Sequence, residues 1–187
     1  PISVDTQKSE VAREALDAGA SIINDIWGLQ KDEQMAVLAA EKQVPVIVMH
    51  NQNHTHYPEG LMCGIRRFFE RSIQIAEQAG VAKERLILDP GFGFGKTADQ
   101  NLEMTKHLHE LRSFGCPILF APSRKSTIGK VLNLPVEERE EGTAALIALA
   151  IAQGVDIVRV HHVRAMLRVA RMCDAVMRDW RPEGWEA

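Results

Sequence analysis

The sequence has few cysteines, little net charge and no long apolar run, and each of these shortages excludes a class of protein. Cys63, Cys116 and Cys173 are odd in number and far apart, so we interpret them as reduced thiols rather than as disulfide or metal ligands. The net charge of −3 provides no basic field for nucleic acid or anionic lipid. No apolar run approaches the roughly 18 residues of a membrane span. We therefore expect a cytoplasmic protein whose partners are small molecules, with no nucleic acid and no membrane among them.

The 187 residues suffice for one domain with a sizeable core. Pro1 is followed at once by the strand-like Ile2–Val4, with no initiator methionine and no leading loop. A barrel strand at a raw chain end would leave an edge unpaired, so we expect further sequence ahead of Pro1. We divide the chain into a barrel domain, residues 1–178, and a C-terminal tail, residues 179–187.

Strand-like apolar runs alternate with helical periodicity along the whole chain. The expected strands are Ile2–Val4, Ser21–Asn24, Val44–Met49, Leu86–Leu88, Pro117–Phe120 and Val155–Val160. Of the expected helices, the first ends near Gly19, the second begins near Asp32 and the third ends near Gly80. The remaining four are expected over Asp99–Phe114, Ile128–Leu132, Glu137–Gln153 and Val163–Met177. This alternation predicts an α/β fold with a parallel sheet. A full barrel needs about 250 residues, so six βα units predict a TIM (β/α)8 barrel lacking its first two βα units; an open six-stranded sheet is the alternative.

Polar side chains stand where five of the six strands end. They are Asp5, Asn24, Asp89, the Ser123–Ser126 segment and the Arg159–His161 segment. Any one carboxylate or amide could simply cap the next helix. Together, charged and amide groups on one rim would be costly unless a ligand or mutual pairing satisfies them. Because the carboxyl ends of barrel strands carry the chemistry, we expect a binding site at this rim.

The glycine-rich segment Gly91–Thr97 resembles a phosphate-binding P-loop, but its spacing is one residue short and Pro90 occupies the place of the first glycine. We interpret the glycines as a tight turn that brings the backbone and Phe94 close to a flat ligand. Lys96 is then expected to be a solvated charge.

Two other clusters of polar residues are expected at the protein surface rather than in a binding site. His50, His54 and His56 could suggest zinc, but no acidic or thiol partner lies nearby, so we expect a mobile polar loop there. The arginines of the last helix are expected on a solvated surface; they are Arg164, Arg168, Arg171 and Arg178.

The strand-end motifs resemble those of the dihydropteroate synthase family, from about Ile2 to Met177. The matching motifs are Ser3–Thr6, Ile23–Asp25, Met49-His50, Asp89–Phe94, Ser123–Ser126 with Ile128-Gly129, Gly142–Ala145 and Arg159–His161. The resemblance implies a transferase of folate biosynthesis, the target of sulfonamides. Such an enzyme joins p-aminobenzoate to 6-hydroxymethyl-7,8-dihydropterin pyrophosphate, forming 7,8-dihydropteroate and releasing pyrophosphate.

The resemblance also implies a role for each site residue. The pterin would be bound by Asp5, Asn24, Met49, Asp89, Phe94, Lys125 and Arg159. The p-aminobenzoate would contact Phe94, Lys125 and Ser126, and the pyrophosphate would contact Arg159 and His161. The residues implied in catalysis are Asp5, Lys125, Arg159 and His161. Carboxylate and amide groups suit the donor-rich pterin edge, whereas a planar guanidinium can stack on the ring.

The family further implies Mg²⁺ as cofactor, with its protein ligand in the segment expected ahead of this chain, and a homodimer. His162 stands where the family usually has Asp, and Ala121-Pro122 stand where Gly and a small polar residue are common. Two alternatives remain open. One is a pterin-binding methyltransferase domain that uses methyltetrahydrofolate, and the other is a non-catalytic pterin-binding paralogue.

Overall fold

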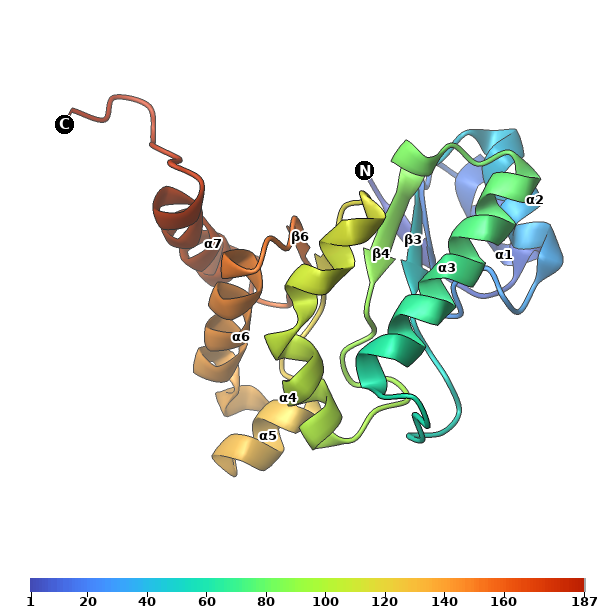
Figure 1. The fold of residues 1–187 in the computed structure, drawn as a ribbon. Helices are drawn as coiled ribbons and strands as arrows, with labels where there is room; N and C mark the ends of the chain where they lie inside the picture. The colour runs from blue at the N-terminus through green and yellow to red at the C-terminus, as the bar shows by residue number, and fades with distance from the viewer. Residues whose placement is uncertain (187) are drawn as a thin grey trace.

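The computed structural model describes residues 1–186, which form parallel strands flanked by helices (Figure 1). Four strands pair in chain order: β1 (Ser3–Asp5), β2 (Ile22–Asp25), β3 (Val46–Met49) and β4 (Leu86–Asp89). A second parallel pair consists of β5 (Leu119–Phe120) and β6 (Ile157–Val158). An isolated parallel bridge between Leu88 and Ile118 joins the two groups. All six expected strands are therefore present, and the α/β class with a parallel sheet is confirmed.

Helices follow the strands in the expected alternation. They are α1 (Ser9–Asp17), α2 (Glu33–Lys42), α3 (Leu61–Ala79), α4 (Ala98–Lys106), α5 (Ser126–Leu132), α6 (Glu140–Ala152) and α7 (Val163–Met177). Three 3₁₀ turns complete the set: η1 (Lys83–Arg85), η2 (Leu108–Phe114) and η3 (Val136–Glu138). In Figure 1, α1, α2 and α3 lie beside β1–β4, whereas α6 and α7 lie together at the opposite end. Within residues 1–186, no helix combines the length and apolar character that crossing a membrane requires.

The single helix predicted over Asp99–Phe114 is wrong, because the chain forms α4 and then η2. The amide of Gln153 replaces one helical hydrogen bond: its Nε2 donates to the Thr105 carbonyl at 2.5 Å, and its Oε1 accepts from the His109 N–H at 3.4 Å. Those two backbone groups would otherwise bond to each other in a continuing helix. A long-range side chain therefore ends α4.

Other element boundaries also differ from prediction. The last two strands are shorter, at two residues each. The Asp156 carboxylate accepts from the Ile118 N–H at 2.9 Å, so a side chain occupies the position of a ladder bond at the start of β6. The helix predicted from Glu137 begins at Glu140, after η3.

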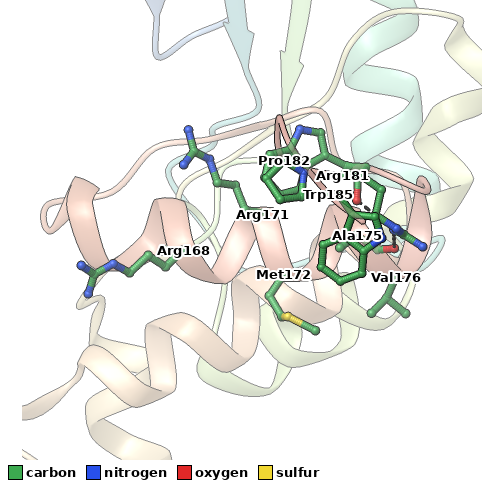
Figure 2. Close-up of a pocket in the computed structure, with 9 residues that line it drawn as sticks. Arg168, Arg171, Met172, Ala175, Val176, Arg181, Pro182 and Trp185 are labelled. Carbon is green, nitrogen blue, oxygen red and sulfur yellow. Dashed lines mark hydrogen bonds between the residues drawn. The ribbon is translucent and has the colours of Figure 1, made fainter. Parts of the chain in front are cut away.

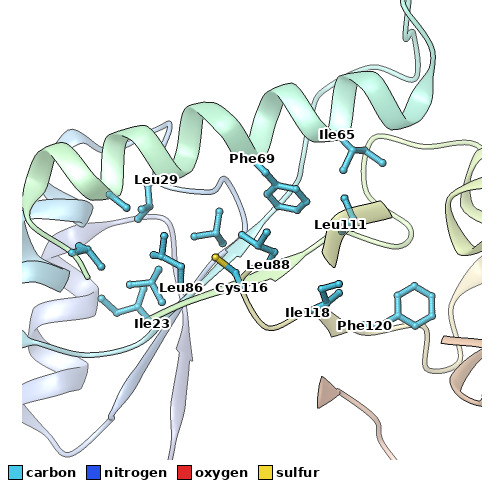
Figure 3. Packing of buried hydrophobic residues seen from close by; sticks show 14 of the residues in the cluster. Ile23, Leu29, Ile65, Phe69, Leu86, Leu88, Leu111, Cys116, Ile118 and Phe120 are labelled. Carbon is cyan, nitrogen blue, oxygen red and sulfur yellow. The ribbon is translucent and has the colours of Figure 1, made fainter. Parts of the chain in front are cut away.

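Both faces of the central strands are buried, as expected for a covered parallel sheet. On the outer face, Ile65 and Phe69 of α3 point toward Leu88 and Leu111 (Figure 3). On the inner face, a smaller cluster of Ile47, Leu119 and Ala121 packs inside the curve of the strands. Burying apolar area contributes roughly 25 cal/mol per Å², so this two-sided packing fixes the strand ends on which the polar groups stand.

Candidate functional site

The predicted site residues lie on neighbouring strand ends. Asp5 pairs in register with Asn24, and Met49 pairs in register with Asp89. Side chains that share a register position on parallel strands stand at the same edge of the sheet. The ends of β1 to β4 therefore present two carboxylates, an amide and a thioether at one rim.

A cavity of about 360 Å³ lies next to this rim. It is lined by Phe94, Ala121, Ser123, Lys125, Arg159, Val160 and His161. Four of these were predicted as site residues: Phe94, Lys125, Arg159 and His161. Segments that follow β4, β5 and β6 thus contribute to one cavity. Its aromatic, cationic and imidazole groups suit a ligand that is flat at one end and anionic at the other.

Hydrogen bonds connect Asp5 to both sides of this rim. Asn24 Nδ2 donates to Asp5 Oδ1 at 2.8 Å, and Arg159 donates to Asp5 Oδ2 at 2.7 Å. The bond to Arg159 joins the end of β1 to the end of β6, 154 residues later in the chain. Asn24 Oδ1 is buried and has no hydrogen-bond partner within residues 1–186. A buried acceptor without a partner is costly, so this oxygen is available to a donor on a ligand.

Asp89 is a buried carboxylate that accepts a hydrogen bond from the Gly91 N–H at 2.8 Å. Burial raises the pKa of Asp89, while the Gly91 bond and the charges of Lys125, Lys96 and Arg159 act in the opposite direction. Burial is thus the largest influence on this group. Hydrogen bonds donated by the edge of a ligand would replace those from water that Asp89 loses by burial.

Lys125 lies beside the Phe94 ring and is influenced by the charge of Asp89. Its Nζ donates to the Phe92 carbonyl and lies 4.7 Å from the centroid of the Phe94 ring. Burial lowers the pKa of Lys125, and Asp89 partly offsets that effect. A cation held over an aromatic face is favourable, and it fixes the direction in which the ammonium group can donate.

The segment after β4 forms the predicted tight turn. Gly91, Gly93 and Gly95 all have positive φ, and the Phe94 N–H donates to the Gly91 carbonyl at 3.0 Å. A Cβ at Gly91 would lie 2.0 Å from the His50 carbonyl oxygen, so no other residue fits there without a shift of the backbone.

Two predictions about this region are wrong. Lys96 is buried rather than solvated, because its Nζ lies among the carbonyls of Gly91 and Phe94 and the imidazole of His50. His50 is also buried rather than part of a mobile loop, whereas His54 and His56 are exposed. His50 directly follows the buried apolar run that ends at Met49, and this position in the sequence could have indicated that His50 is buried as well.

His161 is positioned by Ser123, a serine of the predicted rim to which the sequence prediction gave no role of its own. Ser123 Oγ lies 2.8 Å from His161 Nδ1 and accepts from the His161 backbone N–H at 3.2 Å. Because the hydroxyl accepts that N–H, its own hydrogen is available to Nδ1. This arrangement leaves Nε2 as the ring nitrogen that can face the cavity. Ser126, predicted to contact the second substrate, is exposed and begins α5 directly after Lys125.

His162, where the family usually has Asp, lies outside the cavity. Its Nδ1 is 2.8 Å from Glu140 Oε1, which links the first turns of α6 and α7. Residues 1–186 contain no group of three His, Cys, Asp or Glu side chains arranged to hold a metal ion.

A second hollow, of about 490 Å³, lies between α7 and the segment that follows it (Figure 2). Arg171 lies over the Trp180 ring and Arg181 lies over the Trp185 ring. The described part of the predicted tail therefore packs on α7 through Trp180. Arg164, Arg168 and Arg171 are exposed, as expected, and Arg178 pairs with Asp174 at 3.0 Å.

Comparison with known proteins shows similarity to pterin-binding enzymes across most of the chain. The family profile described as "Pterin binding enzyme" matches residues 1–161. A dihydropteroate synthase of Clostridium beijerinckii is 50% identical over 179 residues, which are 95% of this chain and 66% of that protein. This chain therefore spans slightly less than two thirds of that relative's length.

Solved structures agree with this relationship. The dihydropteroate synthase of Clostridium difficile, solved in the presence of pteroic acid, superposes with a TM-score of 0.94 at 50% identity. The match covers 95% of this chain and 68% of that one. The Yersinia pestis dihydropteroate synthase, solved with a sulfonamide drug complex, gives a TM-score of 0.90 at 40% identity, covering 95% and 67%.

Proposed function

This chain belongs to the family of pterin-binding enzymes, and we propose that the protein containing it is a dihydropteroate synthase. The observation that carries the proposal is the single cavity that unites Lys125 and Phe94 with Arg159 and His161, beside the buried Asp89. A pterin-binding methyltransferase needs the acidic pterin edge but has no use for an anion site at the same cavity.

We infer that the six parallel strands belong to a (β/α)8 barrel that two further βα units complete. The chain matches the Clostridium beijerinckii relative over 95% of its own length but over only 66% of that protein. The ion pair between Asp5 and Arg159 supports a curved arrangement, because it joins the first described strand end to the last.

The buried side of the site would bind the pterin. Asp89 accepts hydrogen bonds from the amino and ring N–H groups, and the free Oδ1 of Asn24 accepts a further one. Lys125 donates to the ring oxygen and nitrogen, and Met49 forms an apolar wall. The guanidinium of Arg159 stacks on the face of the ring.

The reaction is then a substitution at the exocyclic methylene carbon. The amine nitrogen of p-aminobenzoate forms a bond to that carbon, the carbon–oxygen bond to pyrophosphate breaks, and the amine releases a proton to water. Positive charge develops on the carbon as the anion departs, and the carboxylate of Asp5 stabilises it. Arg159 and His161 stabilise the departing pyrophosphate. No covalent enzyme intermediate is needed.

The second substrate would lie on the other side of Lys125. Phe94 provides an aromatic surface, the stem of Lys125 an apolar one, and Ser126 a hydroxyl at the start of α5. A sulfonamide resembles p-aminobenzoate in shape and would compete for this surface. The sulfonamide complex of the Yersinia pestis relative supports this part of the proposal.

Magnesium is part of the proposed activity, but the described residues do not fit it as a site of their own. They include no cluster of three ligating side chains, and Asp5 is already bonded to Asn24 and Arg159. Mg²⁺ prefers oxygen ligands and retains several waters, so an imidazole such as His161 is a poor partner. No step above depends on the ion.

We also propose a cytoplasmic homodimer. Val163 and Leu167 of α7 are exposed apolar side chains that lie one helical turn apart on the same face. Apolar groups gathered on one surface are typical of protein interfaces. Three cysteines, all free, are in keeping with a reducing compartment.

The test is pyrophosphate release by the full-length protein supplied with Mg²⁺, pterin pyrophosphate and p-aminobenzoate. Release that depends on p-aminobenzoate supports a dihydropteroate synthase. Tight binding of the pterin without release would instead indicate a methyltransferase domain or a non-catalytic paralogue. Absence of pterin binding would refute all three.

A further inference from the structure

Lys96 and His50 form a buried polar cluster behind the cavity. Lys96 Nζ lies 2.8 Å from His50 Nδ1, 3.1 Å from the Gly91 carbonyl oxygen and 3.0 Å from the Phe94 carbonyl oxygen. Both side chains are buried, with exposed fractions of 9% for Lys96 and 2% for His50. An ammonium group has three hydrogens to donate, and here it has three partners.

His50 belongs to the strand end rather than to a loop. Its backbone N–H donates to the Asp89 carbonyl at 2.8 Å, and its ring lies edge-on to Phe68, with centroids 4.8 Å apart. Burial and the neighbouring ammonium lower the pKa of His50 to about 2, so the imidazole is neutral. When Lys96 is protonated its ammonium group cannot accept a hydrogen bond, so in that form Nδ1 of His50 is the acceptor and Nε2 carries the proton.

The cluster is costly, which argues for a function. Burying a lysine disfavours its charged form, and long charged side chains are rarely buried without partners. Lys96 could reach solvent if it only had to occupy space in the turn. Instead its ammonium group contacts two carbonyls of the Gly91–Gly95 turn and the side chain of His50, which directly follows β3.

The turn held by Lys96 presents three groups to the site. Gly91 donates its N–H to Asp89, the Phe92 carbonyl accepts from Lys125, and Phe94 lines the cavity. A change in the path of this turn would move all three groups together.

We propose that Lys96, bonded to His50, is a positioning residue that fixes the Gly91–Gly95 turn in the shape the pterin site requires. The inference rests on the proposed function for its meaning, since the ligand that benefits is the pterin. It extends that function by adding two residues that need no contact with either substrate.

The experiment compares Lys96→Met with wild type in the full-length protein, with Lys106→Met as a matched control, since Lys106 is exposed on α4. Hydrogen exchange of the peptide covering residues 90–97 is measured without ligand, and binding of pteroic acid is measured by calorimetry. Losing one buried hydrogen-bond partner costs about 1–3 kcal/mol, so Lys96→Met should speed exchange of that peptide by roughly tenfold or more. Pteroic acid affinity should fall by a similar factor. Lys106→Met should change neither.

A second pair of variants tests His50 with Lys96 unchanged. In His50→Asn, the side-chain oxygen can replace Nδ1 as an acceptor, whereas His50→Leu offers none. We expect Asn to preserve slow exchange and pteroic acid affinity, and Leu to lose both. This pair decides the matter if Lys96→Met does not fold.

Steady-state kinetics separates positioning from simple stabilisation. Positioning predicts that KM for the pterin substrate rises roughly tenfold while kcat changes by less than about threefold. A residue that only stabilises the fold would lower the active fraction and leave KM unchanged. Unaltered exchange and affinity in Lys96→Met, or equal behaviour of the two His50 variants, would overturn the inference. A wild-type protein without turnover would refute the proposed function, whereas the exchange measurement would still test the turn.

Discussion

On one side of the cavity the functional groups are buried, whereas on the other side they are exposed charges that pair with one another. Asp89 and Asn24 are almost inaccessible, and the turn after β4 bonds directly to Asp89. By contrast, the side chains of Arg159 and Asp5 retain 57% and 43% of their exposure and are joined by a single ion pair. Rigid, dehydrated groups suit recognition of a neutral ring, and hydrated charges suit an anion that must leave.

The buried side should be the less tolerant of change. We expect Asp89→Asn to lower kcat/KM for the pterin substrate by more than about a hundredfold, because a charged acceptor for several donors is lost where water cannot replace it. Asp5→Asn, on the exposed side, is the comparison and should cost less. Both variants should retain the thermal unfolding transition of the wild type. If Asp89→Asn unfolds the protein, the carboxylate is structural and its assigned role is wrong.

The buried side also contains a lysine whose pKa is changed by burial. Burial lowers the pKa of Lys96 to about 7, and the charges facing it are Asp89, which opposes this shift, and Lys125, which adds to it; His50 is neutral. Between about pH 7 and pH 10 the unfolded chain therefore holds a proton that the folded protein has released. The free energy of unfolding must rise with pH across that range.

Urea unfolding of wild type and Lys96→Met from pH 6 to pH 10 measures this effect. Relative to the variant, wild type should gain on the order of a few kcal/mol as pH rises through the range. Lys106→Met should follow the wild-type curve. Parallel curves for wild type and Lys96→Met would mean that Lys96 is hydrated in the folded protein.

The difference between the two sides also explains what could be predicted from the sequence. Asp5, Asn24 and Asp89 were placed together because alternating βα units bring strand ends to one edge, and this rule needs only local patterns. Lys96 was misplaced because its burial depends on where His50 lies, 46 residues earlier. Likewise, the end of α4 depends on Gln153, 48 residues beyond Thr105. Periodicity carries no information about such long-range side-chain bonds.

The exposed side should respond to salt, and the buried side should not. Ions at about 0.1 M screen exposed charges beyond roughly 10 Å. Raising NaCl from about 0.05 M to about 0.5 M should weaken binding of pterin pyrophosphate by roughly three- to tenfold. The neutral 6-hydroxymethyl-7,8-dihydropterin lacks the anion and should bind equally well at both concentrations. Arg159→Ala should remove most of the salt dependence for the pyrophosphate. Equal salt dependence for the two ligands would place the anion elsewhere.

The smallest effect is expected at Ser123, which positions a group on the exposed side from a buried position. Its hydroxyl lies 2.8 Å from His161 Nδ1 and thereby favours the form in which Nε2 carries the proton. Ser123→Ala leaves His161 free to turn away, so we expect the inhibition constant of pyrophosphate to rise by roughly two- to fivefold. Ser126→Ala, from the same motif, should instead raise KM for p-aminobenzoate and leave pyrophosphate inhibition unchanged. If Ser123→Ala and Ser126→Ala change the same constant, Ser123 does not orient His161 toward the pyrophosphate. The two sides of the cavity would then not be independent.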